Sequence, residues 1–323
     1  MTVIPALSVI ICTHDPRPDY LGRTLDALRA QTLAREKWEL VVIDNCSREP
    51  LFGRLDLSWH AAARVVREDK LGLTPARLRG IREARADLLV FVDDDNVLDQ
   101  NYLAAALEIS SEHPRLGAWS GSCKGEYEVE PPEWSRKHLL ILCVYGFDRD
   151  YWCNYPFQNQ SMPSGAGLCI RADAARKYLE LHDLGLRPMA LDRTGKSLLS
   201  GGDVDMALTC ADIGYGMGVF PRLKLTHLIP SVRVQKTYLL NLTEAIAASG
   251  VVVDHYHPSP AVPSGSRLKR VLANTLRKLF LSRIDREFYN ARQRGLRTGK
   301  KLVAELIRNG DRGAAASNKT VGG

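Results

Sequence analysis

Three consecutive aspartates, Asp93–Asp95, directly follow the apolar segment Leu88–Val92. Like charges crowded at the end of a half-buried strand destabilise the folded state unless something positive compensates them. A hard divalent cation, bound by carboxylate oxygens and by substrate phosphates, is the natural candidate, so we expect Mg²⁺ or Mn²⁺ here. Such an ion stabilises a diphosphate leaving group as its bond breaks. A solvated acidic turn is the simpler alternative.

Two other apolar segments end in polar residues in the same way. The segment Leu7–Cys12 is followed by Thr13, and the segment Trp38–Ile43 is followed by Asp44. If the three segments are neighbouring parallel strands, their carboxyl ends meet at one edge of a sheet. Ligands bind at that edge in open α/β sheets, so we expect one shared site.

Helical spacing of apolar residues separates these strands. It appears in Asp19–Gln31, Thr74–Ala84 and Tyr102–Ser110, and Ala63–Val66 is a short additional strand. Alternation of apolar strands with helices predicts a mostly parallel, Rossmann-like α/β sheet flanked by helices on both faces. Farther on, the spacing predicts a helix over Asp203–Ile213 and a strand near Val219–Leu225.

The composition fits a soluble globular protein. Apolar residues make up 45% and charged residues 25% of the 323 residues. The seven cysteines are scattered and form no C-x-x-C pair, which argues against a disulfide or zinc framework. The first residues lack the pattern of a secretory signal, and no apolar run approaches the ~20 residues of a membrane span. We therefore expect a cytoplasmic protein, with a peripheral location on the inner face of the cell membrane as an alternative.

The net charge of +7 is concentrated near the end of the chain. Residues 267–312 hold 14 Lys or Arg against four acids, a balance of +10, and Lys319 adds one more. Residues 1–266 are therefore slightly acidic. The basic segment also carries apolar residues at helical spacing, which fits a solvated or packed helix pair, or an interfacial helix on anionic lipid through residues 267–309. Few aromatic residues are interleaved with the basic ones, so we expect no nucleic-acid partner.

Taken together, these motifs resemble the inverting family 2 glycosyltransferases of bacterial type, which have the GT-A fold. The resemblance rests on three segments, namely Ser8–Thr13, Val41–Asn45 and Leu89–Asp95, and covers about residues 7–235. It implies a GT-A catalytic domain over residues 1–240, with a nucleotide-binding half (1–120) and an acceptor half (121–240). A helical basic extension (241–309) and a disordered tail (310–323) would follow.

The resemblance also implies roles for individual residues of the first half. Thr13 would lie against the base and ribose, and Asp44 would hydrogen-bond the base. Arg77, in Ala76-Arg77, would contact base or phosphate. Asp93 and Asp94 would lie near the ribose and the metal ion, with Asp95 as the principal metal ligand.

Downstream, Gly202-Asp203-Val204-Asp205 resembles the acidic motif that precedes a helix in the family, usually Glu-Asp. Asp203 would then be the general base. Because Gly202 replaces the first acid, the choice between Asp203 and Asp205 stays open. By the same resemblance His227 would complete the metal site and Arg233 would meet the diphosphate.

The resemblance thus implies a metal-dependent, inverting hexosyltransferase. It would move a sugar from a nucleotide-sugar, with UDP ahead of GDP or dTDP, to the hydroxyl of a saccharide or lipid-linked acceptor. Synthesis of a cell-surface polysaccharide or glycoconjugate is the expected setting. The sequence identifies neither the sugar, nor the acceptor, nor the oligomeric state.

Other functions fit less of the sequence. Asp93-Asp94-Asp95-Asn96-Val97 also matches the D-x-D-x-[TV] motif of haloacid-dehalogenase-like phosphohydrolases. In that family the motif opens the domain, whereas about 90 residues precede it here. No glycine-rich loop follows the first strand, which disfavours a nucleotidyltransferase or a dinucleotide oxidoreductase. A non-catalytic nucleotide-binding relative remains an alternative.

Overall fold

The computed structural model describes residues 4–155, 159–189, 191–195, 197–258 and 281–320. The chain forms two compact units, Met1–Ser197 with Gly202–Val234, and Leu198–Gly201 with Gln235–Gly323. The first unit therefore ends close to residue 240, where the sequence predicts the end of the catalytic domain. Much of the basic segment, residues 267–280, lies outside the described residues.

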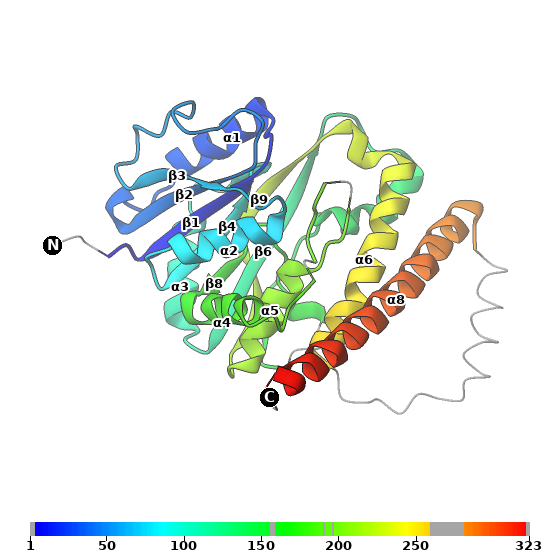
Figure 1. Ribbon diagram of the computed structural model, residues 1–323. Helices are drawn as coiled ribbons and strands as arrows, with labels where there is room; N and C mark the ends of the chain where they lie inside the picture. Colours follow the sequence, from blue (N-terminus) through cyan, green and yellow to red (C-terminus); the bar gives the residue numbers. More distant parts are fainter. Residues whose placement is uncertain (1–3, 156–158, 190, 196, 259–280, 321–323) are drawn as a thin grey trace. The chain divides into compact units, whose positions relative to one another are not determined.

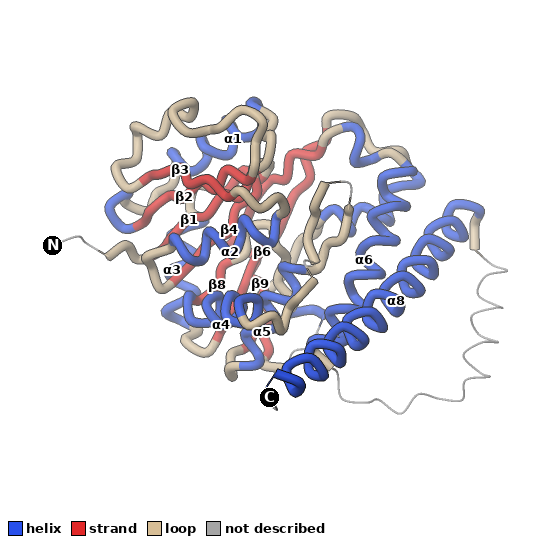
Figure 2. The backbone as a smooth tube through the Cα atoms, viewed as in Figure 1, coloured by secondary structure: helices blue, strands red, loops and turns tan. Residues whose placement is uncertain are grey.

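The first unit is built on one sheet, which Figure 2 shows in red. In the described part of the chain the sheet has nine strands in the order β3-β2-β1-β4-β8-β6-β9-β5, with β7 also paired to β9. The strands are β1 (Leu7–Thr13), β2 (Trp38–Asn45), β3 (Ala63–Glu68), β4 (Leu88–Asp93), β5 (Asn96–Leu98), β6 (Leu116–Tyr127), β7 (Tyr151–Cys153), β8 (Cys169–Arg171) and β9 (Gly216–Ile229).

Most strands run in one direction. Strands β1 to β4 are parallel to one another, β8 is antiparallel to both β4 and β6, and β9 is parallel to β6. Strands β6 and β9 therefore point the same way as β1 to β4, whereas β5, β7 and β8 run against them. The expected strands are all present, and the predicted mostly parallel sheet is confirmed.

Helices cover both faces of this sheet. They are α1 (Pro18–Arg29), α2 (Leu73–Glu83), α3 (Tyr102–Glu112), α4 (Ala172–Asp183) and α5 (Gly202–Asp212), together with the short 3-10 helices η1 (Arg35–Lys37), η2 (Glu133–Leu142), η3 (Asn159–Ser161) and η4 (Ser231–Val234). Figure 1 shows α2, α4 and α5 in front of the strands. Leu21, Leu25 and Leu28 of α1 pack into the main core with Val9 and Ile11 of β1. On the opposite face α2 approaches so closely that a Cβ on Gly80 would lie 2.5 Å from Ile10. The predicted two-faced cover is confirmed.

The second unit consists mainly of α6 (Lys236–Tyr256) and α8 (Arg283–Thr320), which pack side by side (Figure 1). Gly295 and Gly299 of α8 let the helices approach, since a Cβ on Gly295 would lie 2.1 Å from the carbonyl oxygen of Glu244. The ion pairs Lys236–Glu287 (2.9 Å) and Arg294–Glu244 (2.7 Å) flank this contact. The helical extension expected after residue 240 is therefore present in the described residues.

Two further predictions concern the end of the chain and membrane spans. Helix α8 continues through residues 310–320, for which the sequence predicts disorder, and residues 321–323 lie outside the described residues. None of the helices in the described ranges combines the length and apolar character that crossing a membrane requires.

Candidate active site

The strand ends named by the sequence meet at one edge of the sheet. In the β1–β2 register Thr13 lies opposite Asp44, and in the β1–β4 register Cys12 lies opposite Asp93. The hydroxyl of Thr13 donates a hydrogen bond to the Asp94 carboxylate. The predicted gathering of Thr13, Asp44 and the aspartate run is therefore confirmed. It follows from parallel pairing, which places equivalent strand ends side by side.

Asp95 is buried and faces two basic side chains. Its Oδ2 lies 3.4 Å from Nε2 of His227 and accepts a 2.9 Å hydrogen bond from Nη1 of Arg233. The other ring nitrogen of His227, Nδ1, lies 2.9 Å from the carbonyl oxygen of Leu142. A carbonyl can only accept, so Nδ1 carries a proton and Nε2 is the ring nitrogen that faces Asp95. Nη1 of Arg233 also lies 2.9 Å from this Nε2.

The three neighbouring aspartates differ in pKa although they are consecutive. Burial, followed by the charge of Asp95, raises the pKa of Asp93 and raises that of Asp94 to about 7. Burial also acts to raise the pKa of Asp95, but the adjacent His227 and Arg233 outweigh it and hold that pKa below its ordinary value. The surroundings therefore stabilise the charge of Asp95 and disfavour the charges of Asp93 and Asp94.

The residues around Asp95 fit a small oxygen-preferring metal ion held partly by substrate. No group of three or more His, Cys, Asp or Glu forms a metal cluster within the described residues. Asp95 and His227, however, direct a carboxylate oxygen and a ring nitrogen at the same point. Mg²⁺ is commonly bound by one or two protein ligands plus substrate phosphates. Two side chains are thus sufficient, provided that Arg233 turns away from Nε2.

Asp44 is bound by the loop that follows it and by β3. Its carboxylate accepts hydrogen bonds from the backbone N–H of Ser47 (3.1 Å) and of Leu51 (3.0 Å) and from Nη1 of Arg67 (2.9 Å). Burial alone would raise the pKa of Asp44, but these hydrogen bonds lower it. The loop thus holds a permanent carboxylate beside Thr13. Its predicted contact with a base stays a prediction.

Arg77 lies buried at the centre of a second acidic group. Its Nη1 donates a 2.8 Å hydrogen bond to Oδ1 of Asp192, which lies in the loop before α5. Burial alone would lower the pKa of Arg77, but the carboxylates of Asp192, Asp203 and Asp93 raise it. Arg77 is therefore a fixed positive charge between the strand-end aspartates and the start of α5.

The structure distinguishes the two candidate bases of the acidic motif. Asp205 is 1% exposed and its carboxylate accepts a 3.1 Å hydrogen bond from Nε of Arg187. Asp203 is only partly buried, and its Oδ2 accepts a 2.7 Å hydrogen bond from the backbone N–H of Gly165. Geometry therefore favours Asp203 as the group that can meet an acceptor hydroxyl.

Three residues of this site were missed by the sequence reasoning. Asp192 and Arg187 lie in a segment without strong periodicity, and no local pattern links them to Arg77 and Asp205. Gly165 lies in Ser164-Gly165-Ala166-Gly167, a segment of small residues whose types carry no sign of a contact with Asp203. Only Gly202 could have indicated one of them. A glycine in place of the first acid of the motif suggests that another acidic residue, here Asp192, lies near that position.

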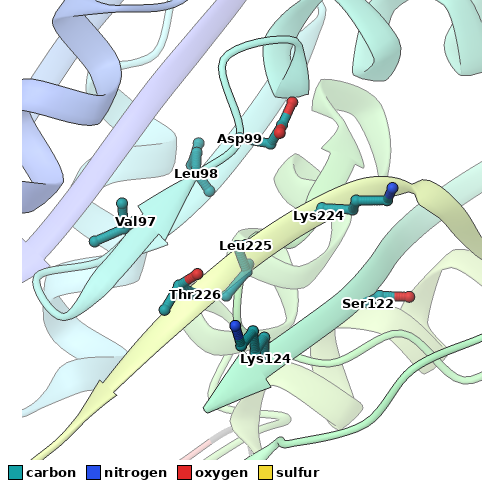
Figure 3. Close-up of a pocket in the computed structure, with 8 residues that line it drawn as sticks. All are labelled: Val97, Leu98, Asp99, Ser122, Lys124, Lys224, Leu225 and Thr226. Carbon is teal, nitrogen blue, oxygen red and sulfur yellow. The ribbon is translucent and has the colours of Figure 1, made fainter. Parts of the chain in front are cut away.

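A cavity of about 350 Å³ in the first unit lies outside this cluster (Figure 3). Its lining includes Ser122 and Lys124 of β6 and Lys224 and Thr226 of β9. Neither the carboxylates of the site nor His227 are among the residues that line it. The cavity therefore does not belong to the carboxylate site.

Comparison with known proteins agrees with this arrangement. The model of the family "Glycosyl transferase family 2" matches residues 8–178, which is more than half of the chain. The match spans β1 to α4 and so includes Thr13, Asp44, Arg77 and the aspartate run. The chain belongs to glycosyl transferase family 2. The predicted family is thereby confirmed, and the phosphohydrolase alternative has no support.

Relatives of this family 2 chain include proteins with known names. It is 24% identical over 151 residues to an uncharacterised glycosyltransferase of Haemophilus influenzae, covering 43% of this chain and 50% of the relative. It is 22% identical over 219 residues to the glycosyltransferase AglE of Haloferax volcanii, covering 67% of this chain and 64% of that protein. The chain thus spans less than two thirds of these relatives.

Solved structures show the fold more completely. Crystal structures of TarS from S. aureus match with a TM-score of 0.53 over 86% of this chain and 44% of that one. A shorter form, TarS 1–349 in complex with UDP-GlcNAc, matches with a TM-score of 0.51 over 88% of this chain and 79% of that one. Sequence identity is 15% in both, so the likeness concerns the fold. The predicted fold class is confirmed.

Proposed function

We propose that this chain is a metal-dependent, inverting glycosyltransferase that moves a sugar from a nucleoside diphosphate sugar to an acceptor hydroxyl. The observation that carries the proposal is the convergence at one sheet edge of Asp95, facing His227 at 3.4 Å, with the strand ends Thr13 and Asp44. Asp203 on α5 supplies a separate carboxylate. One group thus suits a diphosphate and the other suits proton transfer.

The donor would bind along the carboxyl ends of β1, β2 and β4. Thr13 and Asp44 would meet the base and ribose, with Asp93 and Asp94 beside them. The buried charge of Arg77 would balance the negative charge of the donor. A UDP-sugar is the first choice, a choice supported by the fold likeness to TarS, which was crystallised with UDP-GlcNAc.

Asp203 would act as the general base. Its Oδ2 is held by the N–H of Gly165, so Oδ1 would accept the proton of the acceptor hydroxyl as that oxygen attacks the anomeric carbon. Attack from the face opposite the diphosphate inverts the configuration and requires no covalent enzyme intermediate. Asp205, paired with Arg187, would hold the helix in place.

Asp95 and His227 would hold Mg²⁺ or Mn²⁺. When bound, the metal ion supplies a positive charge that stabilises the departing nucleoside diphosphate. Arg233 contacts both ligands and would turn toward the diphosphate when the donor binds. The hydrogen bond from Nδ1 of His227 to Leu142 fixes the ring and keeps Nε2 directed at the site.

Thermal unfolding with nucleotides tests the proposal. UDP together with Mn²⁺ should raise the Tm of the wild type, by an amount that corresponds to about 2.7 kcal/mol at a concentration 100 times the Kd. The rise should disappear in Asp95→Ala because a metal ligand is lost. The matched control is Asp26→Ala, which removes an exposed carboxylate on α1.

Three results would contradict the proposal. The Tm could rise equally with and without Mn²⁺, Asp95→Ala could keep the full rise, or no nucleoside diphosphate could shift the Tm at all. Release of UDP from UDP-GlcNAc would test the chemistry directly. GDP and GDP-mannose in parallel distinguish a different base preference from an absence of donor binding.

We further propose a saccharide or lipid-linked acceptor at the inner membrane face, for synthesis of a cell-surface polysaccharide or glycoconjugate. The supporting feature is the row of exposed basic side chains on α8, namely Arg283, Arg286, Arg292, Arg294, Arg297, Lys300, Lys301 and Arg308. Each basic residue near an anionic bilayer contributes about 1 kcal/mol of binding.

Flotation with vesicles of phosphatidylglycerol and phosphatidylcholine tests the membrane contact. The full chain should float with the anionic vesicles, and the triple variant Arg292→Glu, Arg297→Glu, Lys301→Glu should remain at the bottom. Recovery of the wild type at the bottom would refute the membrane contact, without bearing on sugar transfer.

A further inference from the structure

Gly202, the first residue of α5, has the carboxylate of Asp192 directly over its Cα. A Cβ built on Gly202 would lie 2.2 Å from Oδ2 and 2.6 Å from Cγ of Asp192. Such distances are far below van der Waals contact, so no side chain fits at position 202 while Asp192 stays in place. The space of a side chain at position 202 is thus filled by an acid that lies ten residues earlier in the chain.

The Asp192 carboxylate is deeply buried and accepts hydrogen bonds from two side chains of α2. It is 4% exposed. Its Oδ2 accepts a 2.9 Å hydrogen bond from Thr74, in the first turn of α2, and its Oδ1 accepts the 2.8 Å hydrogen bond from Arg77. The first turn of α2 has no acidic residue of its own. Asp192 thus places one negative charge at the amino ends of both α2 and α5, where helix dipoles favour it.

Through Arg77 this carboxylate reaches the candidate base. A Cβ on Gly165 would lie 3.1 Å from Nη2 of Arg77 and 2.7 Å from Oδ2 of Asp203, so these two groups both lie at that glycine. Asp192 holds the other terminal nitrogen of Arg77, Nη1. Without Asp192, the guanidinium would be free to turn toward Asp203 or Asp93, whose charges it already feels.

We propose that Asp192 is the positioning residue for Arg77, and that its carboxylate replaces an acidic side chain at position 202. The expected first acid of the Glu-Asp motif is then not lost but supplied by the loop before α5. It keeps Arg77 away from Asp203, so that Asp203 stays free to accept a proton. The role of Asp203 as proton acceptor rests on the proposed function. The exchange, by which we mean that the carboxylate of Asp192 replaces one at position 202, does not.

A double-mutant cycle in thermal unfolding tests the exchange without any substrate. Gly202→Asp should lower the Tm sharply in the wild type, because two carboxyl groups then share one space. In the Asp192→Ala background the same change should raise the Tm, because it returns a carboxylate to Arg77. Asp192→Ala/Gly202→Asn is the matched control, with equal size and no charge. Equal effects of Gly202→Asp in both backgrounds would overturn the proposal.

The position of Arg77 can be followed in the same proteins by the ¹⁵N signal of its guanidinium, assigned with Arg77→Lys. The signal should shift in Asp192→Asn, which keeps the size and the partner Thr74, and should return toward the wild-type position in Asp192→Ala/Gly202→Asp. An unchanged signal in Asp192→Asn would show that Asp192 only fills space. This measurement also serves if Asp192→Ala fails to fold.

Turnover of UDP-GlcNAc with Mn²⁺ tests whether the contact of Asp192 with Arg77 affects catalysis. Asp192→Asn should lower kcat by ~10- to 100-fold, as expected for a misplaced catalytic group, with a smaller change in KM. The kcat of Asp192→Ala/Gly202→Asp should be ~10-fold higher than the kcat of Asp192→Ala/Gly202→Asn. Recovery of Tm without recovery of kcat would refute the positioning role. A wild type that binds and cleaves no nucleotide-sugar would refute the proposed function, while the unfolding cycle and the Arg77 signal would still decide the exchange.

Discussion

Oδ2 of Asp203 accepts a 2.7 Å hydrogen bond from the backbone N–H of Gly165. The bond joins the start of α5 to the loop before β8, and it fixes one carboxylate oxygen, while the described residues show no hydrogen bond to the other. Because this hydrogen bond already orients the side chain of Asp203, no further side-chain entropy is lost there when the acceptor binds.

The two aspartates of the acidic motif should respond differently to the same substitution. Asp203→Asn should lower kcat by about 10²- to 10⁴-fold, the usual contribution of a general base, with little change in Tm. Asp205→Asn removes the charge that compensates the buried Arg187 and should destabilise the fold by about 3 kcal/mol while the protein that remains folded keeps turnover. Unfolding curves and kcat with UDP-GlcNAc check both. The reverse pattern would assign the base to Asp205.

Gly165→Ala should impair the site without unfolding the protein. The new Cβ would lie 2.7 Å from Oδ2 of Asp203 and 3.1 Å from Nη2 of Arg77, so both side chains must shift. We expect a ~10- to 100-fold loss in kcat from this displacement. Gly146→Ala is the control, because a Cβ there meets nothing within 4 Å. Equal activity of the two variants would mean that Asp203 needs no support from this loop.

A buried carboxylate on β2 should make stability depend on pH in acid. Glu39 is 1% exposed, and it accepts hydrogen bonds from Ser8 (2.7 Å), the backbone N–H of Arg85 (2.7 Å) and Arg64 (2.6 Å). Burial acts to raise its pKa, but these donors outweigh burial and the pKa lies below the ordinary value of 4.5. A depressed folded-state pKa means that the stabilisation is complete above the ordinary pKa and is lost as the pH falls through the folded-state value.

Glu39→Gln should therefore lower the Tm at pH 7. The amide NH₂ of the glutamine would face the hydrogen-bond donors that surround Glu39, which should lower the free energy of unfolding by about 2 kcal/mol. Below the ordinary pKa the difference from the wild type should shrink, since the wild-type carboxyl becomes protonated as well. Unfolding scans from pH 7 to pH 3 measure this. Glu36→Gln, at an exposed position, should show no such convergence. A constant difference across the pH range would mean that Glu39 acts by shape alone.

The packing of α6 on α8 gives a prediction for the second unit. Gly295→Ala should destabilise it, because the added Cβ would lie 2.1 Å from the carbonyl oxygen of Glu244. Gly250→Ala, on α6, meets nothing within 4 Å and should stabilise that helix by about 0.5–1 kcal/mol. Hydrogen exchange of the α6 amides distinguishes the two, with faster exchange expected only in Gly295→Ala. Similar exchange in both variants would refute close packing at this glycine.

The sequence alone determined the elements and the edge at which they act. Apolar runs that stop at Thr13, Asp44 and Asp93 identified three strands and their carboxyl ends, because a buried parallel strand is apolar throughout and turns polar where it leaves the sheet. Helical periodicity identified α1, α2 and α3 to within a few residues. Local patterns of this kind suffice because each element buries its own apolar face.

Only the tertiary structure decided how the charges are paired. Asp192 and Arg77 are 115 residues apart, and Asp95 and Arg233 are 138 apart. Ion pairs at such separations leave no periodic signal, since only the folded backbone brings the partners together. The contacts that favour Asp203 over Asp205 arise in the same way, because two aspartates of one helix turn are alike until Gly165 and Arg187 approach them. A pattern of residue types specifies the strands and their polar ends, whereas the electrostatic environment of each carboxylate is a property of the assembled core.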